Sequence, residues 1–409
     1  MRPLFACLFT AALVLMSPAA RAQQTGPALE TSETNLRAAL HCPSSFDDPD
    51  HGPVLLVHGT FTDDGYNWGW SYLPALTAAG FDVCTVTLPD HSLGDMQVQA
   101  EYVVYAVRQM AARSGDLVSM IGASQGTLHP RWAVKWWPDV RGSVDDIIFL
   151  AGPHHGTAVT QLGTNFGRCF ASCWQMAVGS NYLAALNAGD ETPGDISYTS
   201  LYTLTDELVQ PQLPTSTSVL DGATNVAIQD LCPTRPVDHV SISTSDAVAY
   251  WLAVDALTHP GAADPARFDV ATCAQPFIEG TTPLDLFSAE GSANFDGEYV
   301  DAEPPLKAYA KPSSASPGGD GPQGAPTDDE GPAPSAGQAE PSEETKVGGK
   351  DGTQVGGVSL PATGAGVLRL VATAMVLLAY GLLLLMRSSR NAERLIFPAS
   401  SRNGSSVNS

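Results

Sequence analysis

Short apolar runs of strand length recur along the chain as far as about residue 280. The runs at 53–57, 117–123 and 147–150 are almost continuously apolar, and the runs at 197–203 and 225–228 are rich in residues that favour strands. Continuous apolar runs of this length are typical of strands buried on both faces, as in parallel sheets. A longer apolar stretch at 246–257 favours a helix. The pattern predicts an α/β fold whose sheet is mostly parallel.

The run at 117–123 leads directly into Gly122-Ala123-Ser124-Gln125-Gly126, which is a G-x-S-x-G motif. A strand that turns this sharply into a helix places its serine in a strained conformation, with the hydroxyl lifted clear of the sheet. Small residues two positions before and after the serine let the turn close. The motif predicts that Ser124 is a catalytic nucleophile.

A serine hydroxyl is a poor nucleophile until an imidazole accepts its proton and a carboxylate orients that imidazole. In α/β-hydrolases these groups follow the nucleophile in the order acid, then histidine. Asp206 comes just after the strand-like run at 197–203, and His239 follows the run at 225–228. Both are expected on loops at the active-site edge of the sheet. We therefore predict that Ser124, Asp206 and His239 form a catalytic triad.

Other acids and histidines lie near these positions. Glu207 adjoins Asp206, and Asp238 adjoins His239, where a solvated loop residue is expected. His154 and His155 follow the run at 147–150 but precede the acid, so we interpret them as pocket-lining or turn residues. His129, one helical turn beyond Ser124, is interpreted as structural.

The run at 53–57 leads into His58-Gly59-Thr60. In this architecture one donor to the oxyanion is the backbone N–H of the residue after the nucleophile, and the other comes from the loop after an earlier strand. These donors are expected to be Gln125 and Thr60, with the Thr60 hydroxyl as a further one. A tight turn at His58-Gly59 is compatible with this role.

Four segments together resemble the lipase-B type of triacylglycerol lipase and its secreted actinobacterial relatives: 53–60, 124–132, 201–212 and 237–239. The resemblance covers about residues 35 to 275. It implies an α/β-hydrolase fold with helices on both faces of the sheet, and ester hydrolysis without a cofactor. It assigns the same triad and the same oxyanion donors. His58 departs from lipase B, which has a proline there.

Cysteine usage is consistent with export. Residues 1–22 have the form of a signal peptide: Arg2, an apolar stretch, and an Ala-Arg-Ala cleavage site before Gln23. Six cysteines follow it, and sequence alone allows fifteen pairings. The resemblance implies Cys42–Cys84 and Cys232–Cys273, which leaves Cys169–Cys173. No C-x-x-C pair is present, so no metal site is expected.

The hydrolase domain is predicted to span 23–280, with an insertion at about 163–194 that contains Phe170, Trp174 and Tyr182. Its place after the run at 147–150 is compatible with a small cap above Ser124. An ordinary satellite core, closed by a disulfide, would have the same composition.

The composition changes beyond the hydrolase domain. Residues 281–357 are rich in Pro, Gly, Ser, Asp and Glu, which predicts a disordered acidic linker. Much of the net charge of −23 comes from acids in or near this part of the chain. We therefore do not attribute the charge to the active site, and it makes nucleic acid an unexpected partner.

Residues 360–364 read Leu-Pro-Ala-Thr-Gly, followed by an apolar stretch at 367–386 and by arginines in the tail at 387–409. The stretch is long enough to span a membrane, although Arg369 interrupts it. The arrangement resembles cell-wall sorting signals of Gram-positive bacteria, in which a sortase-type transpeptidase cuts between Thr363 and Gly364. The threonine is then joined to peptidoglycan. The alternative is a plain membrane anchor.

These features predict an exported enzyme on the surface of a Gram-positive, actinobacterial cell. Its activity is expected to be carboxylester hydrolysis through an acyl-serine, with triacylglycerols as substrates. One alternative is an esterase or acyltransferase that acts on soluble esters or wall lipids. Another is a non-catalytic adhesin on a hydrolase scaffold, because a fold does not determine a function.

Overall fold

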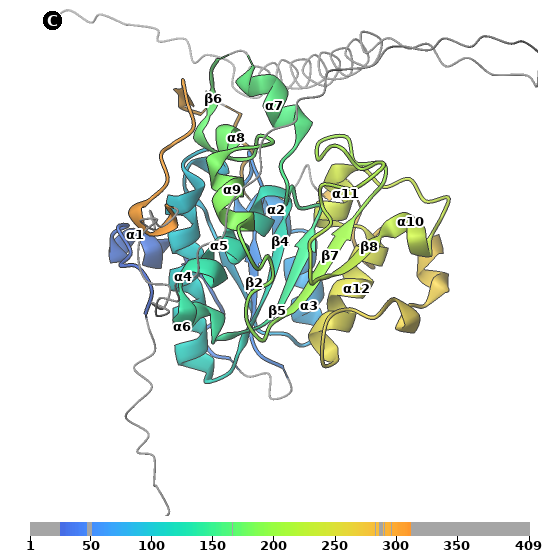
Figure 1. Ribbon diagram of the computed structural model, residues 1–409. Helices are drawn as coiled ribbons and strands as arrows, with labels where there is room; N and C mark the ends of the chain where they lie inside the picture. The colour runs from blue at the N-terminus through green and yellow to red at the C-terminus, as the bar shows by residue number, and fades with distance from the viewer. Residues whose placement is uncertain are drawn as a thin grey trace, which may run out of the picture. The chain divides into compact units, whose positions relative to one another are not determined.

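The computed structural model describes residues 25–46, 51–165, 167–282, 284–285, 289, 291–295 and 297–311, which all belong to one compact unit (Figure 1). The signal peptide, the LPATG motif, the apolar stretch at 367–386 and the tail lie outside the described residues, as does the chain from 312 onward. Within the described ranges no helix is long and apolar enough to cross a membrane.

A seven-stranded sheet forms the centre of the molecule, in the order β1-β3-β2-β4-β5-β7-β8. All neighbouring strands are parallel except β1, which is antiparallel to β3. The prediction of a mostly parallel sheet is therefore confirmed. The strands are β1 Leu40–His41, β2 Val54–Val57, β3 Val83–Val86, β4 Val118–Ala123, β5 Val144–Leu150, β7 Ser197–Tyr202 and β8 Thr224–Ala227.

The strand register brings the functional segments to one edge. Val57 at the end of β2 pairs with Gly122 in β4, and Ala123 at the end of β4 pairs with Leu150 at the end of β5. Tyr202 at the end of β7 pairs with Ala227 at the end of β8. Because the strands are parallel and end together, the chain leaves all of them on the same side of the sheet.

Both faces of the sheet are buried by helices. Leu55 and Val57 pack in one core with α4 and α5, while Val54 and Leu56 pack in a second core with α3 and α12. Figure 1 shows these helices on opposite sides of the strands. The helices are α1 Glu33–Ala38, α2 Asp64–Trp68, α3 Tyr72–Ala78, α4 Met96–Ser114, α5 Leu128–Trp136, α6 Pro138–Arg141, α7 Ala158–Thr164, α8 Ala171–Gln175, α9 Asn181–Asn187, α10 Ile228–Leu231, α11 His239–Thr244 and α12 Ala247–Thr258.

Three disulfides crosslink the fold, with the pairing that the resemblance implies. They are Cys42–Cys84, Cys169–Cys173 and Cys232–Cys273. The first and third close loops of about forty residues, so they restrict the unfolded chain much more than the short second one.

The insertion at 163–194 does not behave as one unit. Tyr182 and Leu183 in α9 belong to the main core, where the Tyr182 ring stacks on Trp132 with 4.3 Å between ring centroids. Phe170 and the disulfide at Cys169–Cys173 form a separate small cluster with Phe61. Part of the predicted cap is thus an ordinary piece of core. Movement of the rest as a lid stays a prediction.

The domain boundary at residue 280 requires correction, because the chain beyond it packs back onto the sheet domain. We call residues 291–295 and 297–311 the strap; it is drawn in orange in Figure 1. Its strand β9 (Tyr299–Val300) pairs antiparallel with β6 (Cys169–Phe170). Further on, Tyr309 packs edge-on against Trp137, and Ala310 is buried in the main core. A few aromatic and backbone contacts order a segment whose composition resembles a linker.

Candidate active site

Ser124 lies at the turn between β4 and a helical turn, η3 (Ser124–Thr127), that leads into α5. Its φ of 53° is in the left-handed region, where residues with a side chain are strained. The neighbouring glycines explain how the turn closes. A Cβ on Gly122 would lie 2.4 Å from the Gly126 carbonyl oxygen, and one on Gly126 would lie 2.3 Å from the Val57 oxygen. The motif is therefore required by backbone contact, and it leaves Ser124 partly exposed.

The structure brings Asp206 and His239 to Ser124. His239 Nε2 lies 2.9 Å from Ser124 Oγ, and His239 Nδ1 lies 2.8 Å from Asp206 Oδ2. The sequence predicted His239 on a loop, but the structure shows it as the first residue of α11. Asp238 is the N-cap of that helix, and its carboxylate accepts from the Ser241 N–H. A capping interaction thus fixes the backbone that carries the imidazole.

Asp206 is held by the backbone of its own loop. Its Oδ1 accepts from the N–H groups of Leu208 and Val209, at 2.9 and 2.7 Å. Its other oxygen faces His239. With only 2% of Asp206 exposed, these donors replace water, so the carboxylate is fixed in the orientation that holds the imidazole.

Glu207 contributes to the site in a way that sequence reasoning missed. Its Oε2 accepts from the backbone N–H of His239 at 3.0 Å. Burial lowers the pKa of His239, but attraction to Asp206, the hydrogen bond that His239 donates to Asp206, and attraction to Glu207 and Asp238 outweigh it. The net pKa of His239 is raised above its usual value. The only sequence signal for this contact is that Glu207 adjoins the acid.

Thr60 and Gln125, the predicted oxyanion donors, are joined through their side chains. Thr60 Oγ donates to Gln125 Oε1 at 2.6 Å, and Gln125 Nε2 donates to the Ser92 carbonyl at 2.8 Å. A Cβ on Gly59 would come within 3.1 Å of Ser124 Cβ. The loop after β2 therefore approaches the nucleophile closely, at a place where only glycine fits without displacement.

The other histidines have different environments. His154 is fully buried with its ring edge-on to Phe149, and burial lowers its pKa well below the usual value. His155 Nε2 lies 3.0 Å from a Glu191 carboxylate oxygen. His129 is fully buried, and burial lowers its pKa to about 3. Ser124 Oγ faces His239 and not any of these residues.

His58 was interpreted from the sequence as part of a turn, but it also joins two strands. Its Nδ1 donates to the Gly59 carbonyl and its Nε2 accepts from the Leu88 N–H, each at 2.9 Å. Leu88 follows β3, so this contact ties the loop after β2, which carries Thr60, to a segment that no local sequence pattern connects with it.

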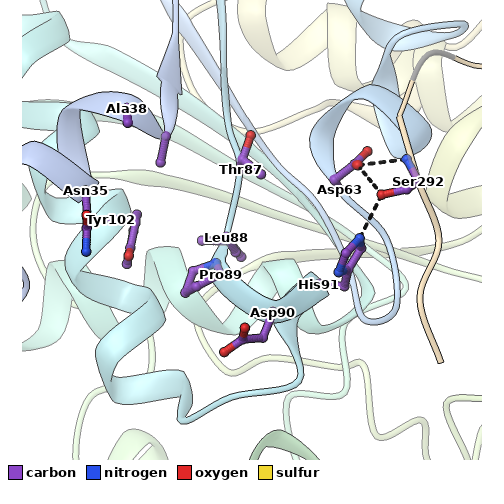
Figure 2. Close-up of a pocket in the computed structure, with 11 residues that line it drawn as sticks. Asn35, Ala38, Asp63, Thr87, Leu88, Pro89, Asp90, His91, Tyr102 and Ser292 are labelled. Atoms are coloured by element: carbon purple, nitrogen blue, oxygen red, sulfur yellow. Dashed lines mark hydrogen bonds between the residues drawn. The ribbon is translucent and has the colours of Figure 1, made fainter. Parts of the chain in front are cut away.

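Two cavities of about 450 and 550 Å³ lie outside the triad, and neither is lined by Ser124. The first is bordered by α1, the turn after β3 and the strap, with Tyr102, His91 and Ser292 among its walls (Figure 2). The second lies beside His155 and Glu191. Within the described ranges no group of three or more His, Cys, Asp or Glu side chains is arranged to hold a metal ion.

Comparisons with known proteins identify relatives of the chain. No family model matches it. Lipase B of Pseudozyma antarctica is 31% identical over 299 residues, which cover 70% of this chain and 87% of that protein. The crystal structure of Aspergillus fumigatus lipase B superposes with a TM-score of 0.64 at 28% identity. It covers 76% of this chain and 77% of that one.

We expect Asp206→Asn to lower kcat near neutral pH by roughly 10³- to 10⁴-fold, because an amide at Oδ2 favours the wrong tautomer of His239. Asp238→Asn, which changes a capping group outside the hydrogen-bonded chain, should lower kcat by less than about tenfold. Steady-state ester hydrolysis on both folded variants makes the comparison. A larger loss in Asp238→Asn would show that Asp206 is not the acid.

The acid limb of the pH profile should also respond to Glu207. A general base must be neutral, so activity falls as pH drops through the pKa of His239, which is raised. Glu207→Gln keeps an oxygen that can accept from the His239 N–H but removes a charge that raises this pKa. The acid limb of kcat/KM should therefore move to lower pH. Asp116→Asn, an exposed change before β4, is the charge-matched control. An unmoved limb in Glu207→Gln would contradict the assignment.

Proposed function

The chain belongs to the lipase B family and is a serine carboxylester hydrolase, and we propose that it is a triacylglycerol lipase that works through an acyl-Ser124 intermediate. The observation that carries the proposal is the hydrogen-bonded chain from Asp206 through His239 to a serine with a φ of 53°. An adhesin would not need a strained serine aligned with a buried base, since strain of this kind costs about 1–3 kcal/mol.

In the proposed first step, Ser124 Oγ attacks the ester carbonyl carbon while its proton passes to His239 Nε2. The carbonyl oxygen becomes an oxyanion, which the N–H groups of Thr60 and Gln125 stabilise. The Thr60 hydroxyl, which donates to Gln125 Oε1 in the free enzyme, can turn to the oxyanion as a third donor. His239 then gives its proton to the leaving alkoxide as the carbon–oxygen bond breaks.

The second half-reaction uses the same groups. Water attacks the acyl carbonyl, His239 takes the proton from the water, and the tetrahedral intermediate collapses. The carbon–oxygen bond to Ser124 breaks, His239 returns the proton to Oγ, and the acid is released. Asp206 accepts hydrogen bonds at both of its oxygens, and in this mechanism it orients His239 and stabilises the imidazolium that forms in each half.

We expect Ser124→Ala to fold but to lose esterase activity by at least about 10³-fold, because no other group replaces the nucleophile. A fluorophosphonate probe followed by peptide mass spectrometry should label Ser124 in the natural chain and nothing in the variant. Hydrolysis of p-nitrophenyl esters of increasing chain length then separates a lipase from an esterase for soluble esters. A label on another residue would refute the assignment.

We further propose that the enzyme is exported and attached to the cell wall. The three disulfides support an oxidising location, and the sequence at 360–364, followed by an apolar stretch and arginines, supports sorting. In this proposal a sortase-type transpeptidase joins Thr363 to peptidoglycan, and the acidic segment after the strap carries the domain toward its substrate.

Attachment to the wall predicts two fractionation results. The natural protein should resist boiling detergent and be released by a muralytic enzyme, whereas Thr363→Ala should remain uncleaved and become soluble in detergent. Immunoblotting of both fractions, with an epitope inside the hydrolase domain, makes the measurement. Complete extraction of the natural protein by detergent, with the segment at 367–386 intact, would show that the segment is only a membrane anchor.

A further inference from the structure

The loop that carries Thr60 is strained at its next residue. Phe61 has a φ of 69°, a left-handed conformation that strains a bulky side chain. Such a conformation persists only where surrounding contacts enforce it. Both backbone groups of Phe61 are bonded to distant segments: its N–H donates to the His91 carbonyl at 2.9 Å, and its carbonyl accepts from the Asn294 N–H at 2.8 Å.

The second of these contacts belongs to a larger pairing between the loop and the strap. Thr62 and Ala293 form an antiparallel bridge, and the Asp63 N–H donates to the Ser292 carbonyl at 3.1 Å. The strap thus pairs through a short antiparallel bridge with the loop that carries Thr60, from about 230 residues away in the chain. Pairing of this kind fixes backbone direction over several residues, which a single side-chain contact does not.

Side chains reinforce the same junction. Asp63 Oδ2 accepts from Ser292 N at 2.7 Å and from Ser292 Oγ at 2.8 Å, while Asp63 Oδ1 accepts from Tyr66 N at 2.8 Å. His91 Nε2 lies 2.8 Å from Ser292 Oγ. Figure 2 shows these three side chains converging, with Ser292 entering from the strap. The Asp63 carboxylate therefore joins the start of α2 to the strap.

The approach of the strap is close enough to require glycine. Gly291 has a φ of +126°, and a Cβ there would lie 2.3 Å from the Tyr66 nitrogen and 2.3 Å from Asp63 Oδ1. Any side chain at this position would push the strap away from the loop. Beyond the junction the Phe295 ring lies 4.9 Å from the Phe61 ring, measured between centroids, so the strap also covers the strained residue.

We infer that the strap is a positioning element of the oxyanion hole: by pairing with Phe61, Thr62 and Asp63, it holds Thr60 beside Ser124 and Gln125. The inference rests on the proposed acyl-transfer function. An oxyanion donor acts only when it is already in place as charge develops, so a loosened loop should slow the chemical step more than substrate binding.

The test compares two identical substitutions in the full-length chain. Gly291→Ala places a methyl group against the loop, whereas Gly280→Ala is made at a glycine with a φ of +81° and nothing within 4 Å of its Cβ position. Gly291→Ala should lower kcat for p-nitrophenyl butyrate by about tenfold relative to Gly280→Ala, with KM within about twofold. The acid limb of the pH profile should not move, because His239 is untouched.

Ser292 supplies a milder pair of variants in case Gly291→Ala does not fold. Ser292→Ala removes the hydroxyl that contacts Asp63 and should lower kcat by about two- to fivefold, as expected for an exposed hydrogen bond to a charged group. Ser292→Thr retains the hydroxyl and should recover most of the loss. An equal loss in both Ser292 variants would contradict the inference.

Amide hydrogen exchange separates this inference from the proposed function. In Gly291→Ala, peptides that contain residues 60–63 should exchange about tenfold faster than in Gly280→Ala, while peptides around Asp206 and His239 should be unchanged. Unchanged exchange at 60–63, or fast exchange with an unaltered kcat, would overturn the inference. If the natural chain hydrolysed no ester and took no fluorophosphonate label, the proposed function would be refuted. Amide exchange at residues 60–63 would still decide whether the strap orders the loop.

Discussion

Ser124 meets His239 only because the chain reverses within a few residues at the end of β4. That reversal demands a φ of 53° at the serine and the absence of a Cβ on Gly122 and Gly126, which touch backbone on either side. The constraint extends outward: Gly126 packs on the carbonyls of Val57 and His58, so β2 must end level with β4. The alignment of strand ends at this edge of the sheet, where Asp206 follows β7, therefore depends on the same turn.

Three carboxylates lie around His239, and each makes a different contact. Asp206 accepts from the ring, Glu207 accepts from the backbone N–H, and Asp238 caps the helix that the histidine begins. Each of these carboxylates also raises the pKa of an imidazole that burial alone would keep neutral. Asp206 also accepts from two backbone N–H groups, so its carboxylate is held in the orientation that faces the imidazole ring. The same three carboxylates thus hold His239 in place and raise its pKa.

Local patterns were sufficient to predict five strands of the central sheet (β2, β4, β5, β7 and β8) and the turn at Ser124, because each depends on a few consecutive residues; β1 and β3 were not predicted. Asp206, which faces His239, was predicted from its place in the chain after the nucleophile and from the family resemblance. The contacts of Glu207 with His239 and of His58 with Leu88 could not be predicted, since they join segments that meet only after the sheet forms. The strap was missed for a related reason. The strap has a composition typical of a linker, yet backbone pairing with Thr62 and β6 orders it, and backbone pairing leaves little trace in composition.

Burial and the nearby carboxylates shift the pKa values of the buried histidines in opposite directions. Burial dominates at His58, His129 and His154, whereas the carboxylates dominate at His239. Burial lowers the pKa of His58 and His154, and lowers that of His129 to about 3, so these rings act near neutral pH as dipoles that hold backbone or fill space. The donors around Gln125 are likewise neutral. In the proposed mechanism, stabilisation of the oxyanion by such neutral groups does not change with pH, whereas protonation of His239, whose pKa is raised, does. Under this mechanism two effects on activity are separable: pH acts through His239, and geometry acts through the loop that we infer the strap to hold.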